Sequence, residues 1–355
     1  MKNIFKDLII VELASVLAGP LAGSFFAELG ARVIKIENIK AGGDVTRQWK
    51  INTENQNNTI SAYYASANTN KEVLMLDLEN PIDQKKLNDL IKTAHVVISN
   101  FQKKTAIKLS VDYKSILKIN NNIIFAQLVA YSYDDPRPGY DLVMQAEAGF
   151  ISMTGTKQGE MVKIPVALMD VIAGHQIKEA VLIALYQKSN TNQGSYVETS
   201  LYKSAISALA NQASNYLMTS HTPIPMGTLH PNIAPYGDII LTSDDISIIL
   251  AVGSDNQFYK LGKSLNFDTI QLARYQKNSD RLQLRKQLIA AIQEKCITLT
   301  YNQLDTLWKS KNIPFCRISD LSSVFENQLA IDMIINETIE GIQTKKVSNI
   351  AFSIS

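Results

Sequence analysis

The sequence predicts an α/β protein in which a parallel, doubly wound sheet is followed by a smaller α+β domain. Three observations predict this arrangement. Short apolar runs alternate with amphipathic helical patterns as far as about residue 218, a segment rich in Pro and Gly follows at 221–237, and a hairpin pattern with three helical patterns comes after it. A chain of 355 residues is long enough to form two domains.

The first predicted motif is a βαβ unit. LIIVEL at 8–13 is typical of a buried strand, LAGPLAGSFFAEL of a tight turn and short helix ended by Gly30, and RVIKIE of a second strand. The alternation continues through predicted strands at 73–78, 96–99 and 123–129 and helices at 81–94 and 113–118. A helix ending near Gln187, a strand in QGSYVETS and a long helix at 201–218 complete this part.

The second predicted part begins at the Pro- and Gly-rich linker 221–237. YGDIILTSDDISIILAVG predicts a hairpin, and helical patterns follow at 255–263, 280–296 and 301–309. The last residues, VSNIAFSIS, are apolar enough to return to the first domain. We therefore expect a large domain formed by 1–220 and 326–355, and a linker with a small α+β domain at 221–325.

Composition narrows the function classes. The net charge is +2 and the basic residues are scattered, which does not indicate a nucleic-acid surface. No apolar run has the length of a membrane span, and Asp7 and Glu12 interrupt the N-terminal one, so we expect a cytoplasmic protein without membrane contact. Cys296 and Cys316 form no CxxC pair, so we expect no disulfide or metal site and place both in the core.

A dinucleotide site is the first functional hypothesis for a βαβ unit. Glu37 ends the second strand, where such folds place the acid that binds a ribose hydroxyl. The turn LAGPLAG lacks the G-x-G-x-x-G pattern, however, because Gly19 and Gly23 are four residues apart with Pro20 between them. The turn therefore argues against a dinucleotide.

Two further loops carry candidate ligand contacts. In AGGDVTRQW, the paired glycines permit a close approach to a ligand, although a solvated loop with an Asp44–Arg47 ion pair would have the same sequence. Asn100 and Phe101 follow a predicted strand at the edge where parallel sheets bind ligands. Phe101 is either a stacking platform for a base or a core residue.

Asp170 is the most informative single residue. PVALMDVIAG sets it at or beside the N-cap of an amphipathic helix, where the positive helix end would favour the anion and lower its pKa. One interpretation is a capping aspartate. The other is a nucleophilic carboxylate directed into a cleft.

Seven segments, in order, resemble the class III coenzyme A transferase family, which includes formyl-CoA transferase, carnitine CoA-transferase and, as a related branch, α-methylacyl-CoA racemase. They are VELASVLAGPLAGSFFAELGARVIKIE with GGDVTR, NTNKEVLMLDL, HVVISNF, GYDLVMQAEAGFISMTG, PVALMDVIAG with QGSYVETSLY, HPNIAPYG, and IPFCRISDLSSV. This resemblance covers nearly the whole chain. It implies a Rossmann-like large domain built from both chain ends, a smaller α+β domain, and a homodimer of two interlocked chains.

The resemblance also implies roles for particular residues. Asp170 matches the catalytic aspartate that forms covalent acyl-enzyme intermediates. The family's CoA-binding positions fall on Leu17, Ala18, Asn38, Leu76, Asp77, Leu78, Glu79, Asn100, Phe101, Lys108, Pro138, Gly139, Tyr140 and Asp141. Lys108 would supply a cation for a phosphate. No tightly bound cofactor is implied, since coenzyme A is a thioester substrate, and the partners are an acyl-CoA donor and a carboxylic acid acceptor.

Two alternative functions stay open. The racemase branch has a histidine after the glycine at the GYD position, and this chain has Tyr140 there. Tyrosine, whose pKa is ordinarily about 10, is a poor base at neutral pH. The sequence therefore favours acyl-CoA:carboxylate CoA transfer over racemisation or epimerisation, with a non-catalytic CoA-binding subunit as the other alternative.

Overall fold

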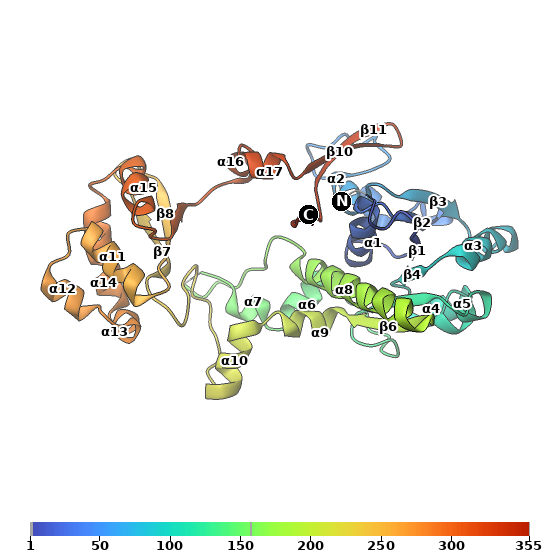
Figure 1. Ribbon diagram of the computed structural model, residues 1–355, viewed down its shortest axis with the longest axis horizontal. Coiled ribbons are helices and arrows are strands. Elements are labelled where there is room, and N and C mark those ends of the chain that lie inside the picture. Colours follow the sequence, from blue (N-terminus) through green and yellow to red (C-terminus); the bar gives the residue numbers. More distant parts are fainter. Residues whose placement is uncertain (1–2, 157, 355) are drawn as a thin grey trace. The chain divides into compact units, whose positions relative to one another are not determined.

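A computed structural model describes residues 3–156 and 158–354 of the chain, which form two compact units (Figure 1). Unit 1 contains the described residues of Met1–Ile151, Lys163–Pro223 and Leu329–Ser355. Unit 2 contains those of Ser152–Val162 and Ile224–Gln328. Unit 1 is therefore assembled from segments far apart in the sequence.

Unit 1 is built on a six-stranded parallel sheet with the order β3-β2-β1-β4-β5-β6, which confirms the predicted parallel sheet. Its strands are β1 (Ile9–Leu13), β2 (Arg32–Asn38), β3 (Glu72–Leu76), β4 (Val96–Ser99), β5 (Ile124–Val129) and β6 (Ser195–Ser200). The strand order reverses between β1 and β4, so the loops that follow these two strands diverge at the carboxyl edge of the sheet. Open α/β sheets bind ligands at such a switch point.

Helices cover both faces of this sheet because neighbouring residues of its strands are buried on opposite sides. Ile10 and Ile98 belong to one core, whereas Val11 and Val97 belong to the other. The first core contains residues of α1 (Ala18–Glu28), α6 (Asp141–Glu147), α8 (Leu168–Thr191) and α9 (Leu201–Ser207). The second contains residues of α3 (Pro81–Thr93), α4 (Lys103–Lys108) and α5 (Tyr113–Ile119).

Shorter elements and a C-terminal hairpin complete unit 1. They are η1 (Ile39–Ala41), η2 (Val45–Gln48), α2 (Ala62–Asn68), α10 (Ala210–Thr219), β10 (Ile334–Ile339) and β11 (Ile342–Val347). Helices α7 (Phe150–Met153) and α17 (Gln328–Ile331) have residues in both units. The single helix predicted at 201–218 is wrong, because α9 ends at Ser207 and the left-handed φ of 45° at Ala210 interrupts the spiral. Ile350 packs against the first core, as the apolar C-terminal residues predicted.

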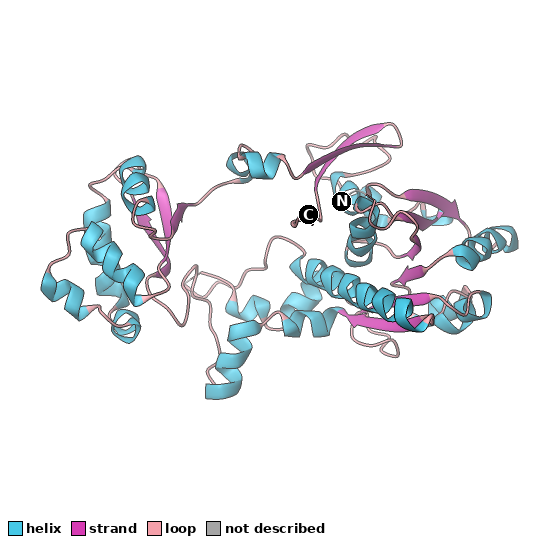
Figure 2. Cartoon of the chain, in the orientation of Figure 1, coloured by secondary structure: helices cyan, strands magenta, loops and turns pink. Residues whose placement is uncertain are grey.

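Unit 2 is a small α+β fold (Figure 2). Its antiparallel sheet pairs β7 (Tyr236–Leu241), β8 (Ser247–Ala251) and β9 (Phe315–Arg317), and its helices are α11 (Asp255–Ser264), α12 (Thr269–Arg274), α13 (Asn278–Gln283), α14 (Arg285–Cys296), α15 (Tyr301–Lys309) and α16 (Leu321–Val324). The hairpin was predicted, whereas α12, α16 and β9 were not. The single helix predicted at 280–296 is wrong, because α13 ends at Gln283 and α14 begins at Arg285. Cys296 is buried as expected, but Cys316 on the short strand β9 is exposed.

Candidate active site

A pocket of about 520 Å³ opens at the switch point of the unit 1 sheet. Loops that follow β1, β2, β4 and β5 form its wall, together with the start of α8. Many of the sequence-predicted site residues line it: Leu17, Ala18, Asn38, Asn100, Phe101, Pro138, Gly139, Tyr140 and Asp170. They meet because the carboxyl ends of parallel strands lie at one edge of the sheet.

A second pocket of about 300 Å³ shares Asn38 and Phe101 with the first. Most of the remaining predicted contacts line it: Leu76, Asp77, Leu78, Glu79 and Lys108. The two pockets are therefore adjacent, with Asp170 lining the first and Lys108 lining the second.

Asp141 lines neither pocket and instead supports the start of α8. Its Oδ1 accepts the Met169 N–H at 2.8 Å, and its Oδ2 accepts a bond from the Gln145 amide at 2.7 Å. The carboxylate therefore ties the first turn of α6 to the first turn of α8 and lies near Asp170.

Asp170 lies within the first turn of α8, whose N-cap is Ala167, so the expectation of a residue at or beside the N-cap is not met. The residue is 7% exposed, and no described residue donates a hydrogen bond to its carboxylate. Burial, with the charge of Asp141 adding to it, raises the pKa of Asp170 to about 7. The prediction that the helix end lowers the pKa of Asp170 was wrong, because the cost of burying the charged carboxylate is larger than the favourable effect of the helix N-terminus. A carboxylate that bonds no backbone N–H is not a cap.

Tyr63, from α2, is a nearby residue that sequence reasoning missed. Burial, with smaller contributions from Asp170 and Asp141, raises the pKa of this phenol to about 12. The hydroxyl is therefore protonated at neutral pH and available as a donor. No motif marks Tyr63, because the loop before α2 has no regular pattern that would direct it towards α8.

The cation expected at the far pocket is already paired. Lys108 Nζ lies 2.5 Å from Glu79 Oε1, and Lys40 Nζ lies 3.3 Å from the other oxygen of Glu79 and 2.8 Å from Asp77 Oδ2. The side chains of Lys40, Glu79 and Lys108 are about half exposed or more, so their pairs contribute little to stability. An incoming phosphate would compete with Glu79 for two ammonium groups, of which only Lys108 was predicted.

Glu37 is not available to a ribose. It is buried and accepts bonds from Arg47 Nε at 2.6 Å, the Tyr64 hydroxyl at 2.7 Å and the Asp44 N–H at 3.0 Å. Arg47 pairs with Glu37 and Asp44 pairs with Lys35, so the suggested Asp44–Arg47 ion pair does not form. The hypothesis of a dinucleotide site is therefore contradicted by the engagement of Glu37 as well as by the missing glycine pattern in the turn between β1 and α1.

Asn100 is also engaged by the protein itself. Its Oδ1 accepts the Ser15 N–H at 3.2 Å, and its Nδ2 donates to the Ser15 carbonyl at 2.9 Å. Asn100 therefore fixes the turn between β1 and α1, and its contact with a ligand stays a prediction.

The chain belongs to CoA-transferase family III, whose sequence model matches residues 5–353, and it is therefore an enzyme of the transferase class. This match confirms the resemblance drawn from the seven segments. Among the described residues, no helix has the length and apolarity that crossing a membrane requires.

Two relatives and one solved structure are similar to this chain over most of its length. The chain is 33% identical over 323 residues to a succinate–glutarate CoA-transferase of Agrobacterium fabrum, covering 89% of this chain and 80% of that one. It is 30% identical to the human succinyl-CoA:glutarate CoA-transferase, covering 92% and 74%. A CAIB/BAIF family protein of Brucella suis superimposes with a TM-score of 0.82 at 30% identity, covering 99% of this chain and 93% of that one.

Proposed function

We propose that the protein moves coenzyme A from an acyl-CoA thioester to a carboxylic acid through a covalent aspartyl-CoA thioester at Asp170. The observation that carries the proposal is a buried carboxylate, unbonded among the described residues, in a pocket whose walls bear the family's CoA-binding positions.

The chemistry proceeds by successive acyl substitutions. An oxygen of ionised Asp170 attacks the donor thioester carbonyl, the C–S bond breaks, and CoA thiolate leaves a mixed anhydride behind. The thiolate attacks the Asp170 carbonyl carbon and expels the donor carboxylate, which leaves the aspartyl-CoA thioester. The acceptor carboxylate then attacks that thioester and releases thiolate. The thiolate attacks the acceptor's acyl carbon, which forms the new acyl-CoA and frees the Asp170 carboxylate.

The environment of Asp170 suits this role. A carboxylate with few hydrogen bonds and a pKa of about 7 is more nucleophilic than a solvated one and is still substantially ionised at neutral pH.

For the substrates, we propose short dicarboxylic acids on both sides of the reaction. The support is the naming of relatives as succinate–glutarate and succinyl-CoA:glutarate CoA-transferases over most of this chain.

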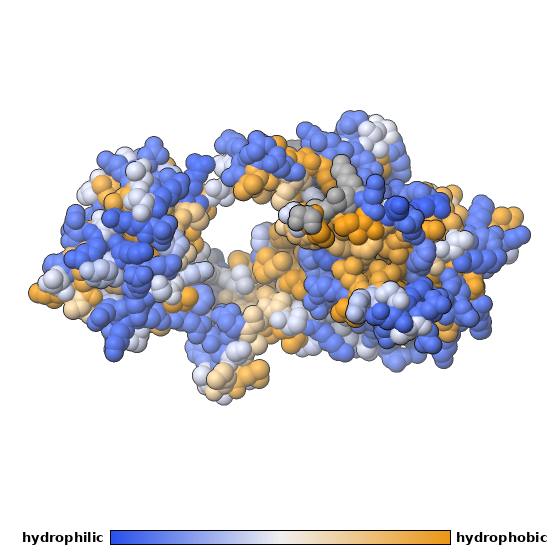
Figure 3. All heavy atoms as spheres, in the orientation of Figure 1, coloured by the Kyte–Doolittle hydropathy of each residue, from blue (hydrophilic) through white to orange (hydrophobic). Residues whose placement is uncertain are grey.

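For the assembly, we propose the interlocked homodimer that the family resemblance implies. Helix α10 has no buried residue, and its Leu217 and Met218 are 79% and 85% exposed. Apolar residues are visible on the surface over this helix (Figure 3). An exposed apolar helix end of this kind suits an interface. Light scattering should give twice the monomer mass, and a monomeric wild type would refute the dimer.

The transferase proposal is tested by trapping. Purified protein is incubated with a panel of acyl-CoA thioesters that includes succinyl-CoA, treated with hydroxylamine or borohydride, and mapped by mass spectrometry. We expect an adduct on Asp170 that is absent in Asp170→Asn and present in the control Asp320→Asn. Continued turnover by Asp170→Ala would refute the mechanism. Exchange of deuterium at the α-carbon without any acceptor acid would instead support the racemase alternative.

A further inference from the structure

The turn between β1 and α1 has a backbone conformation that its sequence does not favour. Val16 has a φ of 71°, in the left-handed region that β-branched residues rarely adopt. Such strain persists only where surrounding groups hold it. The same turn contributes Ala14, Ser15, Val16 and Leu17 to the wall of the 520 Å³ pocket.

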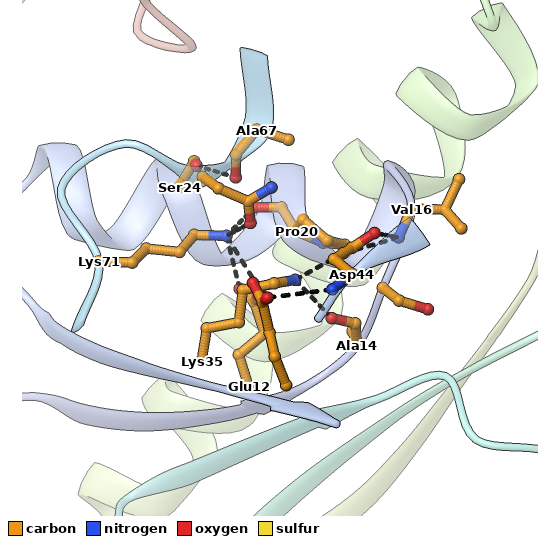
Figure 4. Close-up of polar contacts among 12 residues, drawn as sticks. Glu12, Ala14, Val16, Pro20, Ser24, Lys35, Asp44, Ala67 and Lys71 are labelled. Carbon is orange, nitrogen blue, oxygen red and sulfur yellow. Dashed lines mark hydrogen bonds and ion pairs between the residues drawn. The ribbon is translucent and has the colours of Figure 1, made fainter. Parts of the chain in front are cut away.

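Buried side chains hold this turn from the β2 side (Figure 4). Asp44 Oδ2 accepts the Val16 N–H at 3.2 Å, and Lys35 Nζ donates to the Ala14 carbonyl at 2.7 Å. Lys35 and Asp44 are joined at 3.0 Å, and both side chains are fully buried. Since Asn100 binds both polar groups of Ser15 from the β4 side, the backbone from the Ala14 carbonyl to the Val16 N–H is bonded throughout by side chains.

A second buried pair lies against the first. Glu12 accepts from Lys35 Nζ at 3.2 Å and from Lys71 Nζ at 2.8 Å, and Lys71 also donates to the Pro20 carbonyl of α1 at 2.8 Å (Figure 4). Burial lowers the pKa of Lys35, but Glu12 and Asp44 outweigh it and raise that pKa above its ordinary value. The Lys35–Asp44 pair is therefore charged at neutral pH.

We propose that Asp44 and Lys35 are positioning residues for coenzyme A, holding the 14–17 turn in the one conformation that admits the ligand. This inference rests on the proposed function, because the turn leads into Leu17 and Ala18, both expected to contact coenzyme A. No bond joins Asp44 or Lys35 to Asp170 among the described residues. The pair therefore acts on affinity for the CoA moiety and leaves the chemical steps largely unaffected.

The first test removes one charge of the pair. If Asp44→Asn reduces the fraction of molecules with a competent turn to about a tenth, the Kd for coenzyme A rises about tenfold. We expect that rise by calorimetry with coenzyme A alone, an equal rise in KM for the acyl-CoA donor, and kcat within about threefold of wild type. The matched control is Glu72→Gln, which breaks the exposed Arg32–Glu72 pair on the same sheet. This variant should leave the Kd for coenzyme A and the KM for the acyl-CoA donor unchanged. An unchanged Kd, or a fall in kcat with KM unchanged, would overturn the proposal.

The second test removes the strain. Glycine adopts a positive φ without a steric penalty, so the turn should keep its conformation in a Val16→Gly background without Asp44. We expect Asp44→Asn to change the Kd less than about threefold in that background, whereas the full tenfold loss would overturn the proposed route. The variant that combines Val16→Gly with Asp44→Asn lacks the strain at residue 16. Comparing it with Val16→Gly alone therefore still tests the proposal if Asp44→Asn by itself does not fold.

The two proposals fail in different ways. A wild-type protein that does not bind coenzyme A would remove the proposed function itself. A wild type that binds it, with Asp44→Asn binding equally well, would remove only the positioning role.

Discussion

Replacing Asp170 with asparagine should stabilise the folded protein at neutral and alkaline pH. Asp170 has a pKa of about 7 in the fold against an ordinary 3.8, so the folded protein retains a proton that the unfolded chain releases. A folded pKa above the unfolded one gives stability that is complete below about pH 4 and is lost as pH rises through about 7. Asparagine keeps the shape without the charge.

The shift of about three pKa units sets the expected size. At 1.36 kcal/mol per unit, the ionised wild type forgoes on the order of 4 kcal/mol relative to its protonated form, as an upper limit. The difference in unfolding free energy between Asp170→Asn and wild type should therefore grow towards this value as pH rises from about 4 to about 8.

Urea unfolding followed by circular dichroism at several pH values measures this difference. Asp320→Asn is the matched control, because the exposed Asp320 has a pKa that its hydrogen bonds with Ser323 lower, so it does not titrate in this window. A pH-independent difference for Asp170→Asn would refute the reasoning. If the wild type became more stable relative to Asp170→Asn as pH rose, the predicted sign of the difference in unfolding free energy would be wrong.

Three further outcomes follow from single contacts. Asp141→Asn removes a charge that raises the pKa of Asp170, so the pH profile of adduct formation should move to lower pH; an unmoved profile would exclude this coupling. Gly174→Ala would place a Cβ 2.9 Å from a carbonyl of α1, so we expect a loss of about 1–3 kcal/mol in unfolding free energy, and an unchanged urea midpoint would contradict that contact. Arg281→Met leaves the buried carbonyls of Ala234 and Tyr275 in unit 2 without the Arg281 donor and should cost about 3–5 kcal/mol in unfolding free energy, measured by the fluorescence of Trp308; a variant as stable as wild type would show that these bonds are dispensable.

The sheet could be predicted because its signals are local. Ile10 and Val11 lie in an unbroken apolar run, which is typical of a strand covered on both faces, and such strands alternate with helical patterns along the chain. The lining of the pockets followed from the family segments and from the shared edge of parallel strands.

Pairing of charges could not be predicted, because it depends on three-dimensional neighbours. The spacing of Asp44 and Arg47 suggested a local pair, yet each bonds a residue of β2, since Lys35 and Glu37 point to the same side of that strand. The raised pKa of Asp170 likewise depends on burial beneath loops that are distant in the sequence.

The return of the C-terminal residues to α1 has a consequence for biosynthesis. The Glu28 carboxylate at the end of α1 accepts hydrogen bonds from Lys346 Nζ at 2.6 Å, from the Ser348 hydroxyl and from the Asn349 N–H. During synthesis, unit 1 cannot form these bonds to α1 until the C-terminal residues have left the ribosome. Most of unit 2 is one contiguous stretch, so it can fold earlier during translation.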